Sequence, residues 1–163
     1  KLVMQDMLVR LLDLPDISDE EKNLFEKEGI SFKRPITPEK SIVVDWVAKH
    51  FSKNWADETE AAFTFLPVNC FIAQRNQEIL GFACFESTAK NFFGPTGVLQ
   101  TERGKGIGKI LLTKALLALK EMGYTYAIIG GVGPASYYEK VVDARIIEKS
   151  EKSIYQNLLK HPK

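Results

Sequence analysis

A glycine-rich turn is the part of the sequence whose residue types and spacing are best suited to chemistry. Residues 103–108 read Arg-Gly-Lys-Gly-Ile-Gly and stand between an apolar run and a leucine-rich stretch. Glycine permits positive φ and lets backbone N–H groups approach a ligand without a Cβ in the way. A helix that starts here would add unpaired N–H donors and a positive dipole end. With the basic side chains of Arg103, Lys105 and Lys109, the turn is suited to binding a pyrophosphate.

The spacing of the glycines separates this turn from two common nucleotide motifs. A P-loop needs Gly-x-x-x-x-Gly-Lys-Ser/Thr, whereas only three residues separate Gly104 from Gly108, and Ile110 stands where the magnesium-binding hydroxyl belongs. The dinucleotide fingerprint needs two residues between its last glycines and an acid about 20 positions later, yet residues 128–130 are Ile-Ile-Gly. A plain surface turn remains the structural alternative, although so many glycines would then only weaken the start of the helix.

The elements on either side must hold the turn in place. Residues 92–100 are a strand candidate, although two glycines and a proline weaken strand pairing there. Apolar residues at helical spacing predict a helix over about 106–122, and the apolar run 126–129 is typical of a buried strand. These segments predict a strand–helix–strand crossover over 98–129.

The rest of the chain predicts an α+β (mixed α/β) fold in a single domain over residues 1–163. Apolar runs at 70–73 and 79–85, joined by the turn 76–78, predict a β-hairpin. The other expected segments are a first strand at 7–12, an extended stretch at 30–36, helices from 18 to 28, from 37 to 51, at 56–64 and at 134–140, and closing strands at 144–148 and 153–159.

The composition excludes several functional classes. The chain has 45% hydrophobic and 26% charged residues and a formal charge of +1, so nothing indicates nucleic acid as the main partner. No apolar run approaches the ~20 residues of a membrane span, and the first residues do not resemble a signal peptide. Cys70 and Cys84 are interpreted as buried reduced thiols, with a cross-strand disulfide or a reactive thiol as the alternative. With only His50 and His161 besides, we expect a cytoplasmic protein without a metal site.

The turn resembles the Arg/Gln-x-x-Gly-x-Gly/Ala motif of the GNAT acetyltransferases through Arg103, Gly106 and Gly108. Val98 lies five residues before Arg103, where the family's strand places a valine, and a leucine-rich helix, a strand and a tyrosine pair follow in the family's order. The match is specific over about 92–148. The resemblance implies a mostly antiparallel central sheet that is splayed at its middle strands and flanked by helices on both faces.

The same resemblance implies acetyl-CoA as the co-substrate. The pantetheine arm would pair with the strand around Val98, and a backbone N–H near Thr96 would polarise the thioester carbonyl. The acceptor amine would attack directly, so that no Ser or Cys nucleophile is needed. The backbone that would hold the pyrophosphate is that of Arg103, Gly104, Lys105, Gly106, Ile107 and Gly108.

The tyrosine pair supplies the candidate general acid. The departing thiolate must gain a proton, and the family often places a tyrosine in the short helix after this strand. In this sequence that residue is Tyr138, with Tyr137 as the second candidate. The structural alternative is that one tyrosine packs in the core while the other covers the surface.

The general base has no clear candidate. Many GNAT relatives place a carboxylate on the strand before the turn, but the matching positions are Phe92 and Gly94, which cannot act as bases. Glu86 is the nearest acid in the preceding strand. Asp57, Glu58 and Glu60 begin a helix that often borders the acceptor site, where a solvated or capping role is the alternative, and a water chain would serve equally well.

A glycine-rich segment departs from the family pattern upstream of the tyrosines. Many members carry Asn seven residues and Ala four residues before the catalytic tyrosine, where this chain has Gly131 and Pro134. The open backbone of residues 130–134 either widens the floor of the cleft or simply starts the helix, with proline at its first position.

These patterns predict an N-acetyltransferase that acetylates a primary amine of a small molecule or peptide. The alternatives are a catalytically silent acyl-CoA-binding sensor or scaffold module and a nucleotide-binding domain, which the glycine spacing disfavours. Trp46, Phe51 and Trp55 are candidates for an aromatic acceptor pocket, although helix packing would also explain them. The resemblance leaves the oligomeric state open, with a homodimer as one outcome.

Overall fold

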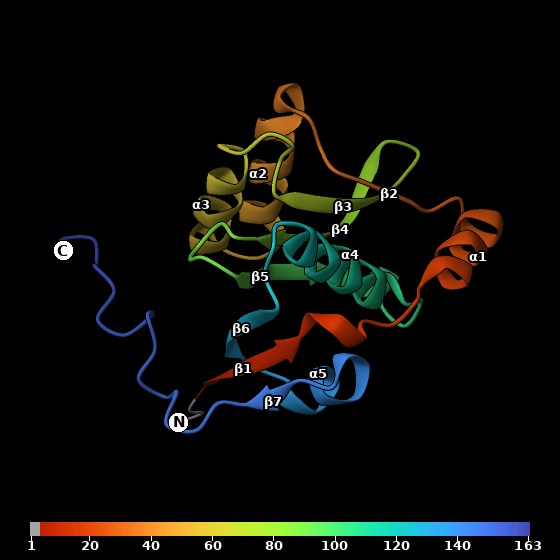
Figure 1. Ribbon diagram of the computed structural model, residues 1–163. Helices are drawn as coiled ribbons and strands as arrows, with labels where there is room; N and C mark the ends of the chain where they lie inside the picture. Colours follow the sequence, from red (N-terminus) through yellow and green to blue (C-terminus); the bar gives the residue numbers. More distant parts are fainter. Residues whose placement is uncertain (1–3) are drawn as a thin grey trace.

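A single seven-stranded sheet frames the protein in the computed structural model, which describes residues 4–163 (Figure 1). The strand order is β2-β3-β4-β5-β6-β1-β7, and every neighbouring pair is antiparallel except β5 and β6. The expected mixed α/β fold with a mostly antiparallel sheet is therefore confirmed. The strands are β1 (Gln5–Arg10), β2 (Ser31–Lys33), β3 (Cys70–Arg75), β4 (Glu78–Phe85), β5 (Phe92–Val98), β6 (Tyr126–Val132) and β7 (Arg145–Ile146).

Helices cover both faces of this sheet, as expected. Two separate apolar clusters show the arrangement: α2 and α3 pack on one face through residues such as Val47 and Ala56, and α4 packs on the other through residues such as Leu111. In β4, Phe82 faces the first cluster and Ala83 the second, the alternation of a strand buried on both sides. The helices are α1 (Ser18–Glu28), α2 (Lys40–His50), α3 (Lys53–Ala62), α4 (Ile107–Glu121) and α5 (Ala135–Val142).

The parallel pair β5–β6 is joined through α4, which confirms the predicted crossover. The two strands pair only at Phe92 with Ile128 and at Phe93 with Ile129, and then diverge. Beyond that point each strand has a bulge against its other neighbour. Gly94 and Pro95 of β5 together oppose one residue of β4, and the Gly130–Gly131 segment of β6 opposes one residue of β1. Because a bulge bends the strand that carries it, the splay follows from these residues.

Local sequence signals explain most element boundaries. Asn76 and Gln77 both take positive φ in the two-residue turn of the β3–β4 hairpin, the conformation that tight hairpin turns prefer. Gly29 ends α1 with φ of 70°, and its N–H bonds back to the last turn of the helix.

Two expected elements are wrong or shortened near the C-terminus. The strand expected at 144–148 is reduced to β7, and residues 153–159 form turns and irregular backbone instead of a closing strand. The edge strand β7 pairs only with Met7 and Leu8 of β1. The chain after it packs Tyr155 against Gly130 and Gly131 of β6, while Ile154, Leu158 and Leu159 stay exposed. These apolar residues do not alternate with polar ones, so the segment lacks the period-2 pattern that would bury one face of a strand.

Candidate active site

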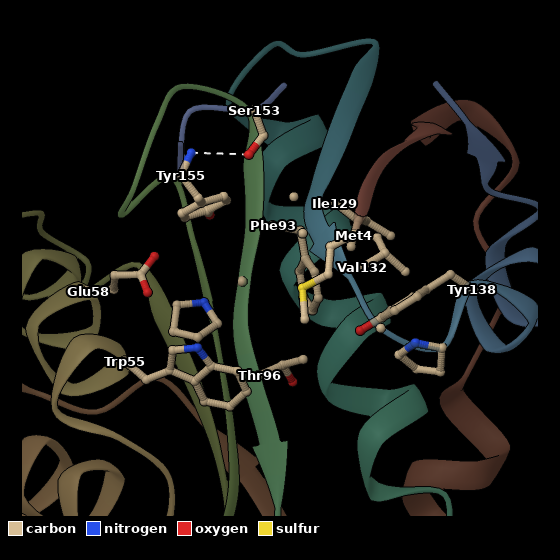
Figure 2. Close-up of a pocket in the computed structure, with 16 residues that line it drawn as sticks. Met4, Trp55, Glu58, Phe93, Thr96, Ile129, Val132, Tyr138, Ser153 and Tyr155 are labelled. Atoms are coloured by element: carbon tan, nitrogen blue, oxygen red, sulfur yellow. Dashed lines mark hydrogen bonds between the residues drawn. The ribbon is translucent and has the colours of Figure 1, made fainter. Parts of the chain in front are cut away.

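Two pockets meet at the gap between β5 and β6. The first, which we call the turn pocket, has a volume of about 570 Å³ and lies between the end of β5, the glycine turn and α5. The second, the gap pocket, has a volume of about 530 Å³ and lies over the two bulges (Figure 2). Thr96, Pro134 and Tyr138 line both pockets. A ligand in one pocket can therefore touch a ligand in the other at these three residues.

The glycine turn has the backbone geometry that the sequence predicts. Gly104 and Gly106 have φ of 83° and 90°, which side-chain-bearing residues rarely adopt, and Gly106 is the N-cap of α4. No side chain caps that helix start, so its first N–H groups are available toward the pocket. A Cβ on Gly108 would enter the space between Val98 and the Tyr137 hydroxyl, 3.8 and 3.6 Å away. The turn is thus an open anion cradle at the positive end of a helix.

The charges around the turn are distributed differently from the prediction. The Lys105 ammonium binds Glu28 at 3.0 Å and Glu102 at 2.9 Å, and Lys105 does not line the turn pocket. Glu102 is buried, and its two oxygens also accept from Arg75 at 3.1 Å each. These hydrogen bonds lower the pKa of Glu102 below its usual 4.5. The Lys105 side chain therefore ties the turn to Glu28 and Glu102 and does not contribute its charge to the turn pocket.

Arg103 and Lys109 are better placed to meet an anion than Lys105 is. Both line the turn pocket, and Arg103 is exposed. Lys109 already has an ion pair with Glu20 at 3.1 Å, in which both side chains remain partly solvated. Such an exposed pair is worth little, so a phosphate could compete for the Lys109 ammonium.

The free edge of β5 runs from one pocket to the other. Val98 and Thr96 lie on the segment that has lost β6 as a partner, so the N–H and C=O groups on that side of the strand have no β6 ladder. Thr96 uses its hydroxyl to donate to the Phe82 carbonyl at 3.0 Å, which leaves its backbone as its contribution to the gap. Gly97 lies beneath Phe51, whose ring would be only 2.4 Å from an added Cβ.

Tyr138 occupies the junction of the two pockets. Its side chain is 9% exposed and packs edge-on against Phe93, while its hydroxyl points into the gap pocket (Figure 2). Burial and the neighbouring Tyr137 raise the pKa of Tyr138 to about 12. The phenol is therefore protonated at neutral pH, so it can donate a hydrogen bond or a proton but cannot act as a base.

Tyr137 faces only the turn pocket, whereas Tyr138 lines both pockets. It lines the turn pocket but not the gap pocket, and it is 37% exposed. Burial raises the pKa of Tyr137 above its usual 10.0. Of the two tyrosines, Tyr138 is buried and Tyr137 is more exposed, yet both face ligand space.

Glu86, the nearest acid to the turn in the preceding strand, does not line the gap pocket. Its φ is 57°, and its carboxylate accepts from the Asn91 N–H at 2.6 Å and from the Tyr124 hydroxyl at 2.9 Å. It lines neither pocket. Glu86 holds the β4–β5 turn, because a left-handed residue at the end of β4 directs its side chain away from the splayed edge.

The gap pocket is lined by segments from both ends of the chain. Trp55 and Glu58 come from α3, and Ser153 and Tyr155 come from the irregular C-terminal segment (Figure 2). Glu58 was one of three helix acids considered at the sequence level. Tyr155 and Ser153 had no recognisable signal, because they were expected in a strand and carry no motif.

The aromatic residues of the early helices form one cluster. Phe51 stacks on Trp55 with ring centres 5.4 Å apart, and Trp46 and Phe82 close the cluster. Only Trp55 of this cluster lines the gap pocket. Helix packing therefore explains Trp46 and Phe51, while Trp55 adds an apolar wall to the gap pocket.

The open backbone of residues 130–134 lines the gap pocket as well. Gly130 has the Phe92 ring 2.9 Å and the Tyr155 ring 3.2 Å from where a Cβ would stand. Gly131 has φ of 59°, and its N–H donates to Asp6 at 2.9 Å. Pro134 is the N-cap of α5 rather than its first helical residue. The segment thus both shapes the pocket floor and leads into the helix.

The model of the acetyltransferase (GNAT) family matches residues 41–140, well over half of the chain. The chain belongs to the GNAT acetyltransferase family. The match includes the glycine turn, the free edge of β5 and the tyrosine pair. No curated protein matches the sequence.

Solved GNAT structures share this fold at low sequence identity. A GCN5-related glucosamine N-acetyltransferase region of a fungal multi-domain GH3 β-N-acetylglucosaminidase matches 88% of this chain with a TM-score of 0.69 and 19% identity. A GCN5-related N-acetyltransferase from Sphaerobacter thermophilus matches 88% with a TM-score of 0.68 and 18% identity. The chain spans only 20% and 48% of these two proteins.

A third GNAT structure contains the donor. The acetyltransferase from Brucella melitensis, solved in complex with acetyl-CoA, matches 72% of this chain and 86% of its own length, with a TM-score of 0.54 and 18% identity. Likeness at this identity shows the fold and not the substrate.

Three further features bear on the GNAT domain. Within residues 4–163, no group of three His, Cys, Asp or Glu side chains is arranged to hold a metal ion. No helix in that part of the chain has the length and apolar character to cross a membrane. Cys70 and Cys84 are cross-strand neighbours in β3 and β4, and both are buried free thiols.

Proposed function

We propose that this GNAT domain transfers an acetyl group from acetyl-CoA to a primary amine of a small molecule. The observation that supports this best is the meeting of the turn pocket and the gap pocket at Thr96 and Tyr138. The turn pocket has the anion cradle that a coenzyme pyrophosphate needs, and the gap pocket opens on the far side of the junction. Donor and acceptor would thus meet across the splayed strands.

The donor would lie along the free edge of β5. The backbone N–H groups of residues 103–108 bind the pyrophosphate, and Arg103 and Lys109 add charge at the pocket wall. The pantetheine amides pair with the strand around Val98, where β6 no longer does. The thioester carbonyl then reaches the level of Thr96, where a strand N–H stabilises the developing oxyanion.

The chemical step would need no covalent enzyme intermediate. The neutral amine attacks the thioester carbon, a C–N bond forms, the C–S bond breaks, and coenzyme A leaves as a thiolate. Tyr138 donates its proton, or a strong hydrogen bond, to the departing sulfur and regains the proton from solvent. Glu86 is excluded from direct proton removal by its place in the β4–β5 turn, so the ammonium proton leaves through water.

The acceptor is the less determined partner. The fungal relative is described as a glucosamine N-acetyltransferase region, which makes glucosamine the first amine to test. The gap pocket, at about 530 Å³, has room for an acceptor of this size. A small molecule is favoured over a peptide because the C-terminal segment covers part of this pocket.

The alternative function is a silent acyl-CoA-binding module. Two measurements made together distinguish it from the proposed acetyltransferase. Release of free thiol from acetyl-CoA is measured with a panel of amines, and coenzyme binding is measured by calorimetry. We expect amine-dependent thiol release. Tight coenzyme binding with no turnover of any amine would favour the silent module instead.

A further inference from the structure

The polar side chains of the gap pocket gather at the end away from Tyr138. Glu58 lies across the pocket from the Tyr138 hydroxyl, and Tyr155 and Ser153 lie on the same side as Glu58 (Figure 2). The reacting amine must approach the junction with the turn pocket, which these residues do not line. Glu58, Ser153 and Tyr155, which we call the distal subsite, therefore meet a part of the acceptor other than its reacting nitrogen.

Glu58 is the only charged side chain that lines the gap pocket within residues 4–163. It is half-buried, and one carboxylate oxygen accepts from the Thr88 hydroxyl. Burial raises the pKa of Glu58, while the Thr88 hydrogen bond opposes that shift. The other oxygen receives no hydrogen bond from the described residues, so it is free to accept one from a ligand in the pocket. Such a group favours a ligand that donates hydrogen bonds to it.

Tyr155 and Ser153 add hydroxyl groups to the same end. The Tyr155 ring packs over the backbone of Gly130 and Gly131, which holds the C-terminal segment against β6. Burial and the nearby Glu58 and Asp6 charges raise the pKa of Tyr155 to about 12, so its phenol stays protonated. The Ser153 oxygen accepts from the Tyr155 N–H at 3.2 Å and keeps its own proton to donate. The distal subsite therefore offers both acceptors and donors.

This mixture discriminates between classes of acceptor. A second ammonium can only donate, so it would satisfy Glu58 but not the hydroxyl protons of Tyr155 and Ser153. An alkyl chain would satisfy none of them and would leave the carboxylate buried without a partner. Hydroxyl groups both donate and accept. Trp55, one face of which stacks on Phe51, supplies an apolar wall beside them.

We propose that the acceptor is a polyhydroxylated primary amine of the amino-sugar class, and that Glu58 selects it by accepting its hydroxyl hydrogen bonds. The amine reacts at the Tyr138 end, the hydroxyls bind at the distal subsite, and the apolar ring face lies against Trp55. This inference rests on the proposed acetyl transfer and names its acceptor class.

The test compares glucosamine with two amines of similar size, cyclohexylamine and 1,6-diaminohexane, in steady-state acetylation assays. We expect the wild-type protein to use glucosamine with a KM at least about tenfold below that of either other amine. Glu58→Gln keeps the shape of the side chain and removes its charge. It should raise the KM for glucosamine by about 10- to 100-fold, the effect of losing charge-assisted hydrogen bonds, with kcat changed less than about threefold.

The matched control is Glu60→Gln. Glu60 lies on the same helix, is exposed, pairs with Lys40 at 3.8 Å and lines a different surface from the gap pocket. It should leave the kinetics unchanged. Neither variant should change the dissociation constant for acetyl-CoA. Glu58→Gln should not raise the KM for cyclohexylamine, because this amine makes no hydrogen bond to the carboxylate that could be lost.

Five results would overturn the inference. A loss of kcat for every amine at unchanged KM would make Glu58 a proton acceptor instead of a selector. A lower KM for the diamine than for glucosamine would show that the gap pocket selects a second ammonium group. A lower KM for cyclohexylamine would show that it selects an apolar ring. If acetyl-CoA binds but no amine is acetylated, the proposed transfer fails and the inference fails with it. If other amines are acetylated but glucosamine is not, the inference about the acceptor class fails and the proposed acetyl transfer stands.

Discussion

Phe93 of β5 pairs with Ile129 of β6, and directly beyond this pair both strands bulge away from each other. The bulges are made of different residues, Gly94–Pro95 on one side and Gly130–Gly131 on the other, yet they lie at the same level of the sheet. Both line the gap pocket. The opening in the sheet therefore depends on two bulges, one in each strand.

Gly106→Asp should weaken acetyl-CoA binding by more than about tenfold, or about 1.4 kcal/mol. The φ of 90° is costly for any side chain, and a carboxylate at the start of α4 would repel the pyrophosphate. Titration calorimetry measures the change. Gly123→Asp is the control, because Gly123 has a similar φ of 107° but lies at the other end of α4. An unchanged affinity in Gly106→Asp would remove the turn from the donor site.

Tyr138→Phe should lower kcat by about 10²-fold, the lower end for loss of a positioned acid, with little change in the acetyl-CoA dissociation constant. The phenol is protonated, aimed at the junction and 9% exposed, so Phe keeps the packing and removes only the hydroxyl. Tyr137→Phe is the comparison and should have the smaller effect. Full activity of Tyr138→Phe would shift the acid role to Tyr137 or water.

Gly97→Ala should destabilise the fold by about 1–3 kcal/mol, the usual cost of overpacking. The added methyl would stand 2.4 Å from the Phe51 ring, which the stacked Trp55 prevents from moving away. Urea denaturation measures the free energy of unfolding. Gly133→Ala serves as the control, because no atom lies within 4 Å of its added Cβ. Equal stability of the two variants would show that the Phe51 ring can move away from residue 97 at little energetic cost.

Glu102→Gln should destabilise the protein by about 1–2 kcal/mol near neutral pH, because Arg75 and Lys105 lose a shared partner while staying partly solvated. The pKa of Glu102 is lowered in the folded state. Its contribution is therefore complete above the ordinary value of 4.5 and is lost as pH falls through the lower folded value.

Thermal melting of the wild type and Glu102→Gln across pH measures this difference. The two melting temperatures should begin to converge as pH drops below about 4.5, where the Glu102 carboxylate of the unfolded chain takes up its proton while that of the folded protein still resists protonation. A constant difference down to pH 3 would show that the effect of Glu102 is not electrostatic. Glu78→Gln, at the exposed start of β4, is the control and should change little.

The sequence predicted the glycine turn and its flanking elements well because their signals are local. The glycine turn, the helix after it and the strand before it carry their information in residue type and spacing, and the structure places them as expected. The role of Lys105 was misjudged because its partners, Glu28 and Glu102, come together only in the fold. Spacing along the chain does not reveal which way a lysine side chain turns.

The acceptor side was predicted poorly for the same physical reason. Tyr155 acts through contact with Gly130 and Gly131, far away in the sequence, and its own segment has no periodic pattern that produces an element. Glu86 was assigned by proximity in sequence, yet a positive φ at the end of β4 turns it into the β4–β5 loop. The positive φ of Glu86 thus gives its carboxylate a structural role in the loop, where it accepts from the Asn91 N–H, and keeps it out of the gap pocket.

The residues that line the two pockets are distributed differently along the sequence. All residues that line the turn pocket lie between 96 and 141, in one continuous stretch, whereas the gap pocket draws on positions from Met4 to Tyr155. Substitutions in α3 or in the C-terminal segment can therefore alter one pocket and leave the other intact. Under the proposed function, such a layout would let related proteins differ in their acceptor and keep the same donor, because the two pockets are encoded in separable parts of the chain.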